Sequence, residues 1–324
     1  MEVEVVVEDV NDNPPTIQPA QFSISESAEP GTVIGQLSFS DPDADQQLQL
    51  FIASGNPHGD FGIRSTGEVF LVKAVDYERN PSYRLQVLVS DGKFSAQAPL
   101  TISVQDANDH DPTCHQAWLE ASVSEDAEEG QSIIRMDAED QDATDILRFQ
   151  LLGHSDAAFA IQASGWLVVA GPLDREKQAS YSFKARALDS GGRYCETDIR
   201  IRLEDVNDNP PALPDQLLFE VRENLAEGPQ LIGRLTANDP DLRLAGRVQF
   251  AIAQADAQTR ELFKLEEESG VVSVLRPLDR EERAEYNFTI VANDQGREQL
   301  ASQAPISIKV LDLNDNPPVW IQVK

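Results

Sequence analysis

The sequence predicts an all-β protein: three tandem seven-stranded Greek-key β-sandwiches, Ig-like in class, arranged as an elongated rod. Three observations predict this class. An acidic motif recurs along the 324 residues at nearly constant steps, the segments between its copies alternate apolar and polar residues, and no segment keeps a helical period with caps. Short strands separated by Gly, Pro, Asn and Asp are typical of a β-sandwich of about 100 residues.

The recurring motif reads DVNDNPP at residues 9–15 and 205–211. It returns as DLNDNPP at 312–318 and as the variant DANDHDP at 106–112. The first aspartates of successive copies are 97, 99 and 107 residues apart. Self-similarity at a fixed period is the signature of tandem structural units, so the motif marks the boundaries between repeats.

These steps divide the chain into predicted units. They are the last strand of a preceding repeat with its linker at 1–13, three repeats at 14–111, 112–210 and 211–317, and a tail at 318–324. The third repeat holds about five to six extra residues between Asp241 and Asp279, for which we predict a longer loop. The chain starts on a strand-like pattern and lacks the basic and apolar regions of a signal peptide, so we expect it to be a piece of a longer protein.

Between the motifs, apolar residues recur at every second position, as in half-buried strands. The clearest runs are Tyr83–Val89, Tyr181–Ala187 and Tyr286–Ala292, followed in the first two repeats by Leu100–Val104 and Ile199–Leu203. Each first run ends in a single aspartate, and each second run leads into the next linker motif. The pattern therefore places acidic residues at strand ends.

Charge excludes several classes of function. Lys and Arg number 26 against 56 Asp and Glu, a net charge of -30, which repels phosphate backbones and anionic membranes and attracts cations. The longest apolar runs are far shorter than the roughly 18–20 residues of a membrane-spanning helix. Paired carboxylates recur at predicted domain ends, whereas a glycosidase has one pair in a cleft, and HExxH and GxSxG motifs are absent, so we do not expect an enzyme.

Five acidic motifs keep one order through the three repeats: a glutamate after a strand, Asp-x-Asp, Asp-x-Glu, a lone aspartate and the linker motif. Such oxygen-rich side chains suit Ca²⁺, which takes six to eight oxygen ligands. An EF-hand is excluded, because the loop opening at Asp41 has Gln46 where Gly is needed and Ile52 where Glu is needed. A single Asp-x-Asp is usually solvated surface charge, but an ordered set at fixed spacing indicates a built site.

This ordered set resembles the extracellular repeats of the cadherin superfamily, most closely those of the long Fat and Dachsous type or of protocadherin-like members. The resemblance covers nearly the whole chain. It implies calcium ions at the junctions between repeats, about three at each complete junction, with ligands from both repeats and from the linker. The variant linker has His110 and Asp111 where the other copies have Asn and Pro, and the loop at 143–146 is shorter than the family pattern.

The resemblance implies four ligand sets. At the first-to-second junction they are Glu26, Asp76, Glu78, Asp106, Ala107, Asn108, Asp109, His110, Asp140, Asp142 and Asp189. At the second-to-third junction they are Glu125, Asp174, Glu176, Asp205, Asn207, Asp208, Asp239, Asp241 and Asp294, with backbone carbonyls of Val206 and Asn209. Half-sites at the two ends comprise Asn11, Asn13, Asp41, Asp43 and Asp91, and Glu223, Asp279, Glu281, Asp312 and Asp315.

Two functions follow from the resemblance. In the first, the segment belongs to the extracellular part of a single-pass plasma-membrane protein and binds another cadherin, in trans or in cis, with calcium stiffening the rod. In the second, it is a spacer or mechanical tether that touches no partner. Neither involves nucleic acid, and any membrane anchor lies outside this segment. A carbohydrate-binding module of a secreted bacterial enzyme would need an aromatic platform, and aromatic residues are only 6% of the chain.

The two cysteines, Cys114 and Cys195, allow either one disulfide or two buried thiols. In the family that the chain resembles, the first and last strands of a repeat run parallel and side by side. This arrangement brings both cysteines to one end of the second repeat and predicts a disulfide. Asn287-Phe288-Thr289 is the one acceptor sequence for N-linked glycosylation, because Pro81 disqualifies Asn80. The strand alternation turns Asn287 outward, so we expect room for a glycan.

Overall fold

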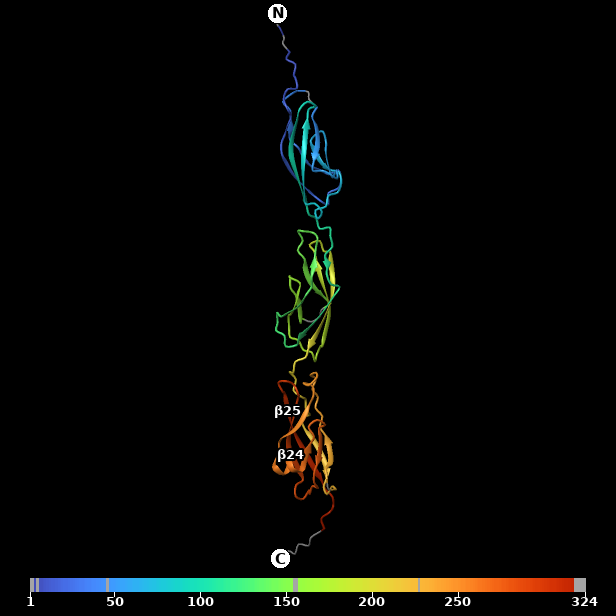
Figure 1. The fold of residues 1–324 in the computed structure, drawn as a ribbon. Helices are drawn as coiled ribbons and strands as arrows, with labels where there is room; N and C mark the ends of the chain where they lie inside the picture. The colour runs from blue at the N-terminus through green and yellow to red at the C-terminus, as the bar shows by residue number, and fades with distance from the viewer. Residues whose placement is uncertain (1–2, 4–5, 45–46, 154–156, 227, 318–324) are drawn as a thin grey trace.

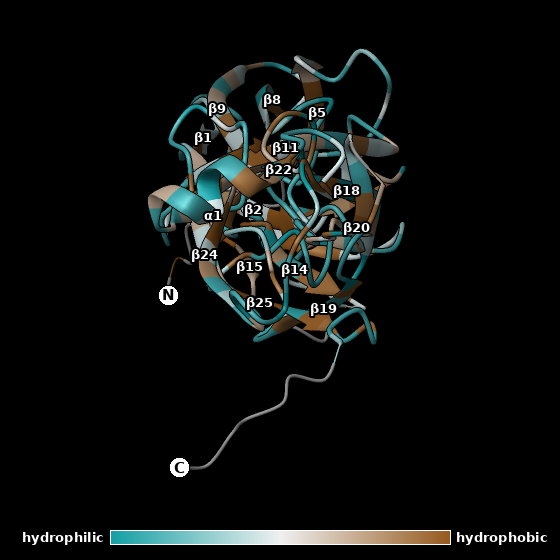
Figure 2. Ribbon diagram, turned by 90° about the horizontal axis from the view of Figure 1, so that it is seen from below, coloured by the Kyte–Doolittle hydropathy of each residue, from teal (hydrophilic) through white to brown (hydrophobic). Residues whose placement is uncertain are grey.

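Alternating apolar residues form strands throughout the computed structural model, which describes residue 3 and residues 6–44, 47–153, 157–226 and 228–317. The strands build three β-sandwiches placed end to end, with the chain termini at opposite ends of an elongated molecule (Figure 1). Viewed along its length, apolar strand segments lie inside and hydrophilic loops lie at the rim (Figure 2). The predicted class of tandem all-β sandwiches is confirmed.

In the first sandwich, a four-stranded sheet of order β2-β9-β8-β5 packs on a three-stranded sheet of order β3-β7-β6, and β1 pairs with β4. The nine short strands correspond to the seven predicted, because each of the first two strands is split in two. The bounds are β1 (Thr16–Ile17), β2 (Ala20–Ser25), β3 (Val33–Gln36), β4 (Phe39–Ser40), β5 (Gln49–Ser54), β6 (Phe61–Ile63), β7 (Glu68–Leu71), β8 (Ser82–Ser90) and β9 (Ser95–Gln105).

The second sandwich repeats this order as β11-β18-β17-β14 on β12-β16-β15, with β10 paired to β13. Its strands are β10 (Thr113–Cys114), β11 (Trp118–Ser124), β12 (Ser132–Arg135), β13 (Ala138–Glu139), β14 (Arg148–Leu152), β15 (Phe159–Ile161), β16 (Trp166–Val169), β17 (Ser180–Leu188) and β18 (Tyr194–Glu204).

The third sandwich has the orders β19-β25-β24-β21 and β20-β23-β22, with one short helix. Its elements are β19 (Leu217–Arg222), β20 (Gln230–Arg234), β21 (Gln249–Gln254), α1 (Ala257–Leu262), β22 (Phe263–Leu265), β23 (Val271–Val274), β24 (Glu285–Asn293) and β25 (Ala301–Leu311).

The prediction of one longer loop in the third repeat is wrong. The extra residues are shared between the turn before β21, the segment that holds α1 and the turn before β23. Asp256 caps the helix by accepting a hydrogen bond from the Thr259 amide at 2.7 Å. The helix has six residues, too few to show a helical period in the sequence.

One aromatic contact holds each sandwich core in the same way. A phenylalanine of the small sheet meets a tyrosine of the large sheet edge to face, with ring centroids 4.8, 4.9 and 5.1 Å apart in Phe61–Tyr83, Phe159–Tyr181 and Phe263–Tyr286. The repeat is therefore visible in core packing as well as in the acidic motifs.

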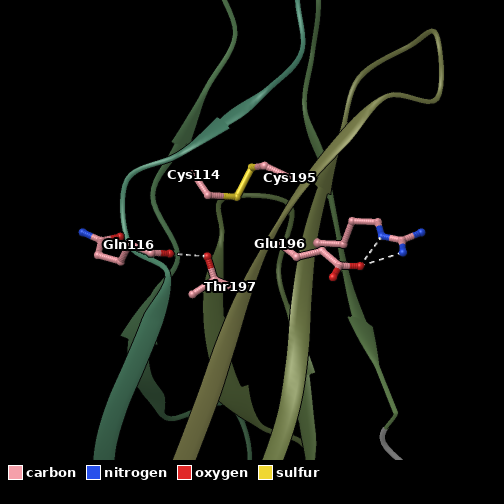
Figure 3. The surroundings of a disulfide bond; sticks show 6 residues. Cys114, Gln116, Cys195, Glu196 and Thr197 are labelled. Atoms are coloured by element: carbon pink, nitrogen blue, oxygen red, sulfur yellow. Dashed lines mark hydrogen bonds and ion pairs between the residues drawn. A yellow bond between two sulfur atoms is a disulfide. The ribbon is translucent and has the colours of Figure 1, made fainter.

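The first and last strands of each sandwich lie parallel, as expected. In the second repeat, β11 pairs with β18 from Trp118 opposite Asp198 to Ser124 opposite Glu204. Cys114 and Cys195 form the predicted disulfide, which joins the start of the repeat to the start of its last strand (Figure 3). Below it, the Thr197 hydroxyl donates to the carbonyl of Gln116 at 2.7 Å.

Two predicted units reach beyond the described residues. The tail at 318–324 lies outside them altogether. Residue 3 and residues 6–13 belong to no strand, although the sequence predicts one there. Within the described part of the chain, no helix has the length and apolar character needed to cross a membrane.

Candidate metal centres at the repeat junctions

A buried glutamate organises the lower end of the first sandwich. Glu26 follows β2 directly, and only 7% of it is exposed. One of its carboxylate oxygens accepts from the Tyr77 amide at 2.6 Å, and the other accepts from the Ala107 amide at 2.6 Å. Glu26 therefore joins the Asp-x-Glu loop to the start of the linker, and so brings together three of the acidic motifs identified in the sequence.

Acidic side chains from both sandwiches meet at this first-to-second junction, in the narrow waist between them (Figure 1). One group whose ligand atoms lie within 4.8 Å of one another joins Glu78 of the first repeat, the linker residues Asp109 and His110, and Asp142 of the second repeat. A second group of this kind comprises Glu26, Asp76 and Glu78.

The linker is fixed to the second repeat by further contacts. Asp106 accepts from the Thr144 amide at 2.8 Å. Asp140 accepts from the Asp142 amide at 3.0 Å, which folds the Asp-x-Asp turn. Asp189 is 5% exposed and accepts from the Arg193 amide at 2.7 Å. Asn108 reaches Asp145, an aspartate that sequence analysis missed, although it is the third Asp in the loop that begins at Asp140.

The second-to-third junction uses the same framework. Glu125 accepts from the amides of Arg175 and Val206 at 2.6 and 2.7 Å. Groups within 4.8 Å comprise Glu125, Glu176 and Asp205, and Glu176, Asp208 and Asp241. Asp205 accepts from the Leu242 amide at 2.9 Å, so the linker again holds the following loop.

The remaining members of this set also contact residues of the junction. Asn207 donates to Asp294 at 2.9 Å, and Asp294 is fully buried. Asn209 donates through its side chain to Asp241 at 2.9 Å and to Asp208 at 2.6 Å. Asp174 forms an ion pair with Lys177 at 2.6 Å, and its negative charge helps to raise the pKa of the linker residue Asp208.

Arg175 distinguishes this junction from the first. Its guanidinium contacts Asp205 at 2.5 Å, pairs with Glu176 and donates to the carbonyl of Pro240 in the next repeat at 2.9 Å. Only 10% of its side chain is exposed. The corresponding residue is Tyr77 in the first repeat and Arg280 in the third, so the first and second junctions differ in whether an arginine stands at this position.

Several oxygens at these sites are buried without a hydrogen-bond partner. Among the described residues, they include both carboxylate oxygens of Glu78 and one oxygen each of Asp41, Asp91, Asp106, Asp140, Asp189, Asn207 and Asp239. A buried polar atom without a partner costs free energy, and a cation is a natural partner for a carboxylate. The donor set, which consists of carboxylate and amide oxygens, fits a hard divalent cation such as Ca²⁺.

Hydrogen bonds, among them bonds from amide groups, lower the pKa of Asp174 and, against the effect of burial, that of Asp189, but the pKa of four other junction carboxyls is raised. Burial raises the pKa of the half-buried carboxyls of Glu78 and Glu176, and the negative charges of Glu26 and Glu125 respectively add to the shift. Burial also raises the pKa of Asp140 and of Asp239. A raised carboxyl pKa means that the ionised form is disfavoured, so a cation at either junction would relieve this cost.

The half-site residues at the chain ends are brought together less completely. At the amino end, Asn13 donates to Asp43 at 2.7 Å, Asp41 accepts from the Asp43 amide at 3.0 Å, and Lys93 donates to the Asn11 carbonyl at 2.6 Å. Asp91, in the same loop as Lys93, accepts from its amide at 2.7 Å.

At the carboxyl end, Glu223 accepts from the amides of Arg280 and Leu313 at 2.8 and 2.6 Å. The Arg280 guanidinium lies 3.3 Å from Asp312 and 3.6 Å from Glu281. Asp279 accepts from the Glu281 amide at 2.9 Å, and Asp315 accepts from Asn224 at 2.5 Å. These residues form one side of a junction, without a following repeat in this chain.

Comparison with known proteins gives one consistent result. The family model for the cadherin domain matches residues 20–105, 119–204 and 217–311. Human Protocadherin Fat 1 is 37% identical over 332 residues, covering 98% of this chain and 7% of that protein. The Drosophila melanogaster Fat-like cadherin-related tumor suppressor homolog is 34% identical over 325 residues, covering 98% and 7%. This chain thus spans about 7% of the length of these relatives.

The fold comparison agrees. The crystal structure of mouse Cadherin-23 EC22-24 superposes with a TM-score of 0.74 at 27% identity, covering 93% of this chain and 100% of that chain.

Proposed function

The chain belongs to the cadherin family, and we propose that it is an extracellular rod segment whose two internal junctions bind calcium, about three ions at each. The observation that carries the proposal is the set of buried oxygens without a hydrogen-bond partner, which includes both oxygens of Glu78. Bound calcium would neutralise the carboxylates and link oxygens of two successive repeats. We place the repeats at 14–111, 112–210 and 211–317.

The residues of this chain prepare the junctions for that role. Glu26 and Glu125 hold the Asp-x-Glu loops against the linkers through backbone amides. Asp106 and Asp205 hold the linkers against the next repeat. The ligand oxygens are therefore positioned by hydrogen bonds that do not depend on the cation. The half-sites at the two chain ends would bind calcium more weakly, since in this chain each has ligands from only one repeat.

For the rod as a whole, we propose recognition of another cadherin, in cis or in trans, as part of the extracellular region of a single-pass plasma-membrane protein. A spacer role is the second candidate, and one feature of the second repeat favours it. The outer face of its large sheet carries ion pairs beside the exposed Trp118, with Arg186–Glu196 at 2.7 Å, Arg202–Glu120 at 3.0 Å and Lys184–Asp198 at 3.4 Å. Charged side chains are depleted in the dehydrated cores of protein interfaces, so these ion pairs disfavour burial of this face against a partner.

Thermal unfolding and small-angle scattering in calcium and in chelator test the calcium proposal. Extracellular sites bind at about 10⁻⁴–10⁻³ M, so roughly 2 mM calcium adds about 0.6–1.8 kcal/mol of stability for each independent ion. We expect a higher melting temperature and a narrower distribution of lengths in calcium, with magnesium at equal concentration as the control. Identical melting curves in calcium and chelator would refute calcium binding.

Sedimentation in calcium separates the two roles. A segment that binds another copy of itself should self-associate as its concentration rises. A spacer should sediment as a monomer at every concentration. Loss of self-association in chelator would link recognition to the calcium-bound rod.

A further inference from the structure

The large sheet of the third repeat carries an uncharged row of residues on its outer face. Leu218 of β19 lies opposite Ser307 of β25, and Ser307 lies opposite Asn287 of β24. Neighbouring strands are about 4.8 Å apart, so the row spans roughly 10 Å. Leu218 lies on the edge strand β19, at the end of the row, and is 73% exposed.

The same row is charged in the other two repeats. In the first repeat it reads Gln21, Thr101 and Arg84 across the corresponding strands. In the second repeat it reads Glu120, Arg200 and Ser182. The third repeat alone has leucine, serine and asparagine in this row, and the Glu285 carboxylate of the neighbouring row accepts from Ser307, so this face suits a ligand that is part apolar and part hydrogen-bonding.

A groove of about 440 Å³ runs along this row. Leu218, Asn287, Thr289 and Pro305 line it, together with polar groups of Gln216 and Ser307 and the carboxylate of Glu285, which accepts a hydrogen bond from the Ser307 hydroxyl at 2.5 Å. A pyranose ring matches such a lining, because its C–H face packs on apolar side chains while its hydroxyl and amide groups bond to polar ones.

Asn287 and Thr289 supply the acceptor sequence within the groove itself. Asn287 is exposed on β24, and Thr289 lies two residues further along the same outer face. We propose that Asn287 carries an N-linked glycan whose first sugar lies in this groove and covers Leu218. The proposal rests on the extracellular role argued above, since the modification occurs on the secretory route.

The chemistry is a group transfer from a lipid-diphosphate-linked oligosaccharide. The amide nitrogen of Asn287 forms a bond to the anomeric carbon of the sugar. The bond from that carbon to the phosphate oxygen breaks, and the lipid diphosphate leaves while the amide nitrogen loses one proton. Because β24 is paired on both sides in the folded sheet, the transfer takes place on the emerging chain, before β25 pairs with β24.

The first test is the intact mass of the chain secreted from mammalian cells, before and after treatment with peptide N-glycosidase. We expect the wild type to lose the mass of one glycan. The Asn287→Gln and Thr289→Ala variants should carry none, and Thr289→Ser should keep it. A wild type without a glycan overturns the inference; if its melting temperature still rises in calcium, the proposed function stands independently.

The second test asks whether the glycan occupies the groove. Enzymatic release from the folded wild type should be several-fold slower than from Leu218→Ser, and the two rates should be equal after denaturation. Leu231→Ser is the matched control, because Leu231 is 71% exposed but lies on β20 of the opposite sheet. Equal release rates from folded wild type and Leu218→Ser would show a glycan that projects freely and would overturn its placement in the groove.

Discussion

The two internal junctions share an acidic framework but balance its negative charge in different ways. At the first, both oxygens of Glu78 and one of Asp106 are buried without a hydrogen-bond partner. At the second, the equivalent residues Glu176 and Asp205 are both contacted by the Arg175 guanidinium. The second junction therefore holds a permanently charged arginine beside these carboxylates, whereas at the first the cationic group nearest Glu78 is His110, at 4.0 Å, which is charged only when protonated.

The difference shows that one residue sets the character of a junction. The middle residue of the Asp-x-Glu motif is Tyr77 in the first repeat and Arg175 in the second. Its backbone amide has the same role in both repeats, because it donates a hydrogen bond to Glu26 in the first and to Glu125 in the second. Its side chain decides whether calcium meets free carboxylates or has to displace an ion pair.

The largest expected effect concerns the end of the second repeat that faces the first junction. The Cys114–Cys195 disulfide closes a loop with a sequence separation of 81 residues. The chain-entropy model then gives about 4.5 kcal/mol as the upper stabilisation of the second repeat. Replacing both cysteines with alanine should lower the free energy of unfolding by up to this amount, measured by urea denaturation in calcium.

The disulfide also lies close to one junction only. Arg193, two residues before Cys195, donates to the carbonyl of His110 in the first linker at 2.9 Å. The double variant should therefore weaken calcium binding at the first junction and leave the second unchanged. Peptide mapping that recovers two freely alkylated thiols from the wild type would remove the basis of this prediction.

Much of this comparison could be predicted from sequence. The order of acidic motifs placed Glu26, Glu78, Asp109 and Asp142 in one family-like set, and the structure brings them to one junction. Residue spacing suffices there because every motif sits at a strand end, and strand ends in a sandwich gather at two poles.

Other features could not be predicted, because they depend on side-chain direction or on very short segments. Whether Arg175 points to solvent or between carboxylates is decided by its rotamer and by the approach of Pro240 from the next repeat. Asp145 lies in a loop of altered length, where family spacing gives no register. Helix α1 is stabilised by a cap at Asp256 and an ion pair with Arg283 at 2.9 Å, neither of which leaves a periodic signal.

The next largest effect is expected from variants that each remove one calcium ligand from a single junction. Asp208→Ala and Asp109→Ala each remove a linker carboxylate that lies between two repeats. Loss of one such ligand should weaken calcium binding at that junction about tenfold, equivalent to about 1.4 kcal/mol. Calorimetric titration measures both midpoints, and Asp198→Ala on the outer sheet face is the control. An unchanged midpoint and stoichiometry in Asp208→Ala would exclude this residue from the ligand set.

A smaller effect follows from exchanging the middle residues of the Asp-x-Glu motifs. Arg175→Gln removes the cation that calcium has to displace, so the midpoint of the second junction should fall roughly threefold, or about 0.7 kcal/mol. In chelator, the same variant should melt at a lower temperature, because its carboxylates lose their partner. Tyr77→Arg should shift the first junction in the opposite direction. If both variants titrate like the wild type, the arginine does not set the calcium requirement.

The smallest effect concerns His110, which stands where the second linker has Asn209. Its ring nitrogen lies 3.1 Å from Asp142 and 2.6 Å from Asp109, just as Asn209 contacts Asp241 and Asp208. Burial acts to lower the pKa of His110, but the hydrogen bond to Asp142 and the charge of Asp109 outweigh it and raise the pKa above 6.5.

A folded-state pKa above the unfolded value means that His110 stabilises the calcium-free protein fully below pH 6.5, and that this contribution is lost as the pH rises through the folded value. His110→Asn keeps a donor at this position but cannot titrate. The melting temperature of the calcium-free wild type, relative to this variant, should therefore be higher at about pH 6 than at about pH 8. A difference that stays constant across this range would show that His110 acts only as a hydrogen-bond donor, equivalent to Asn209.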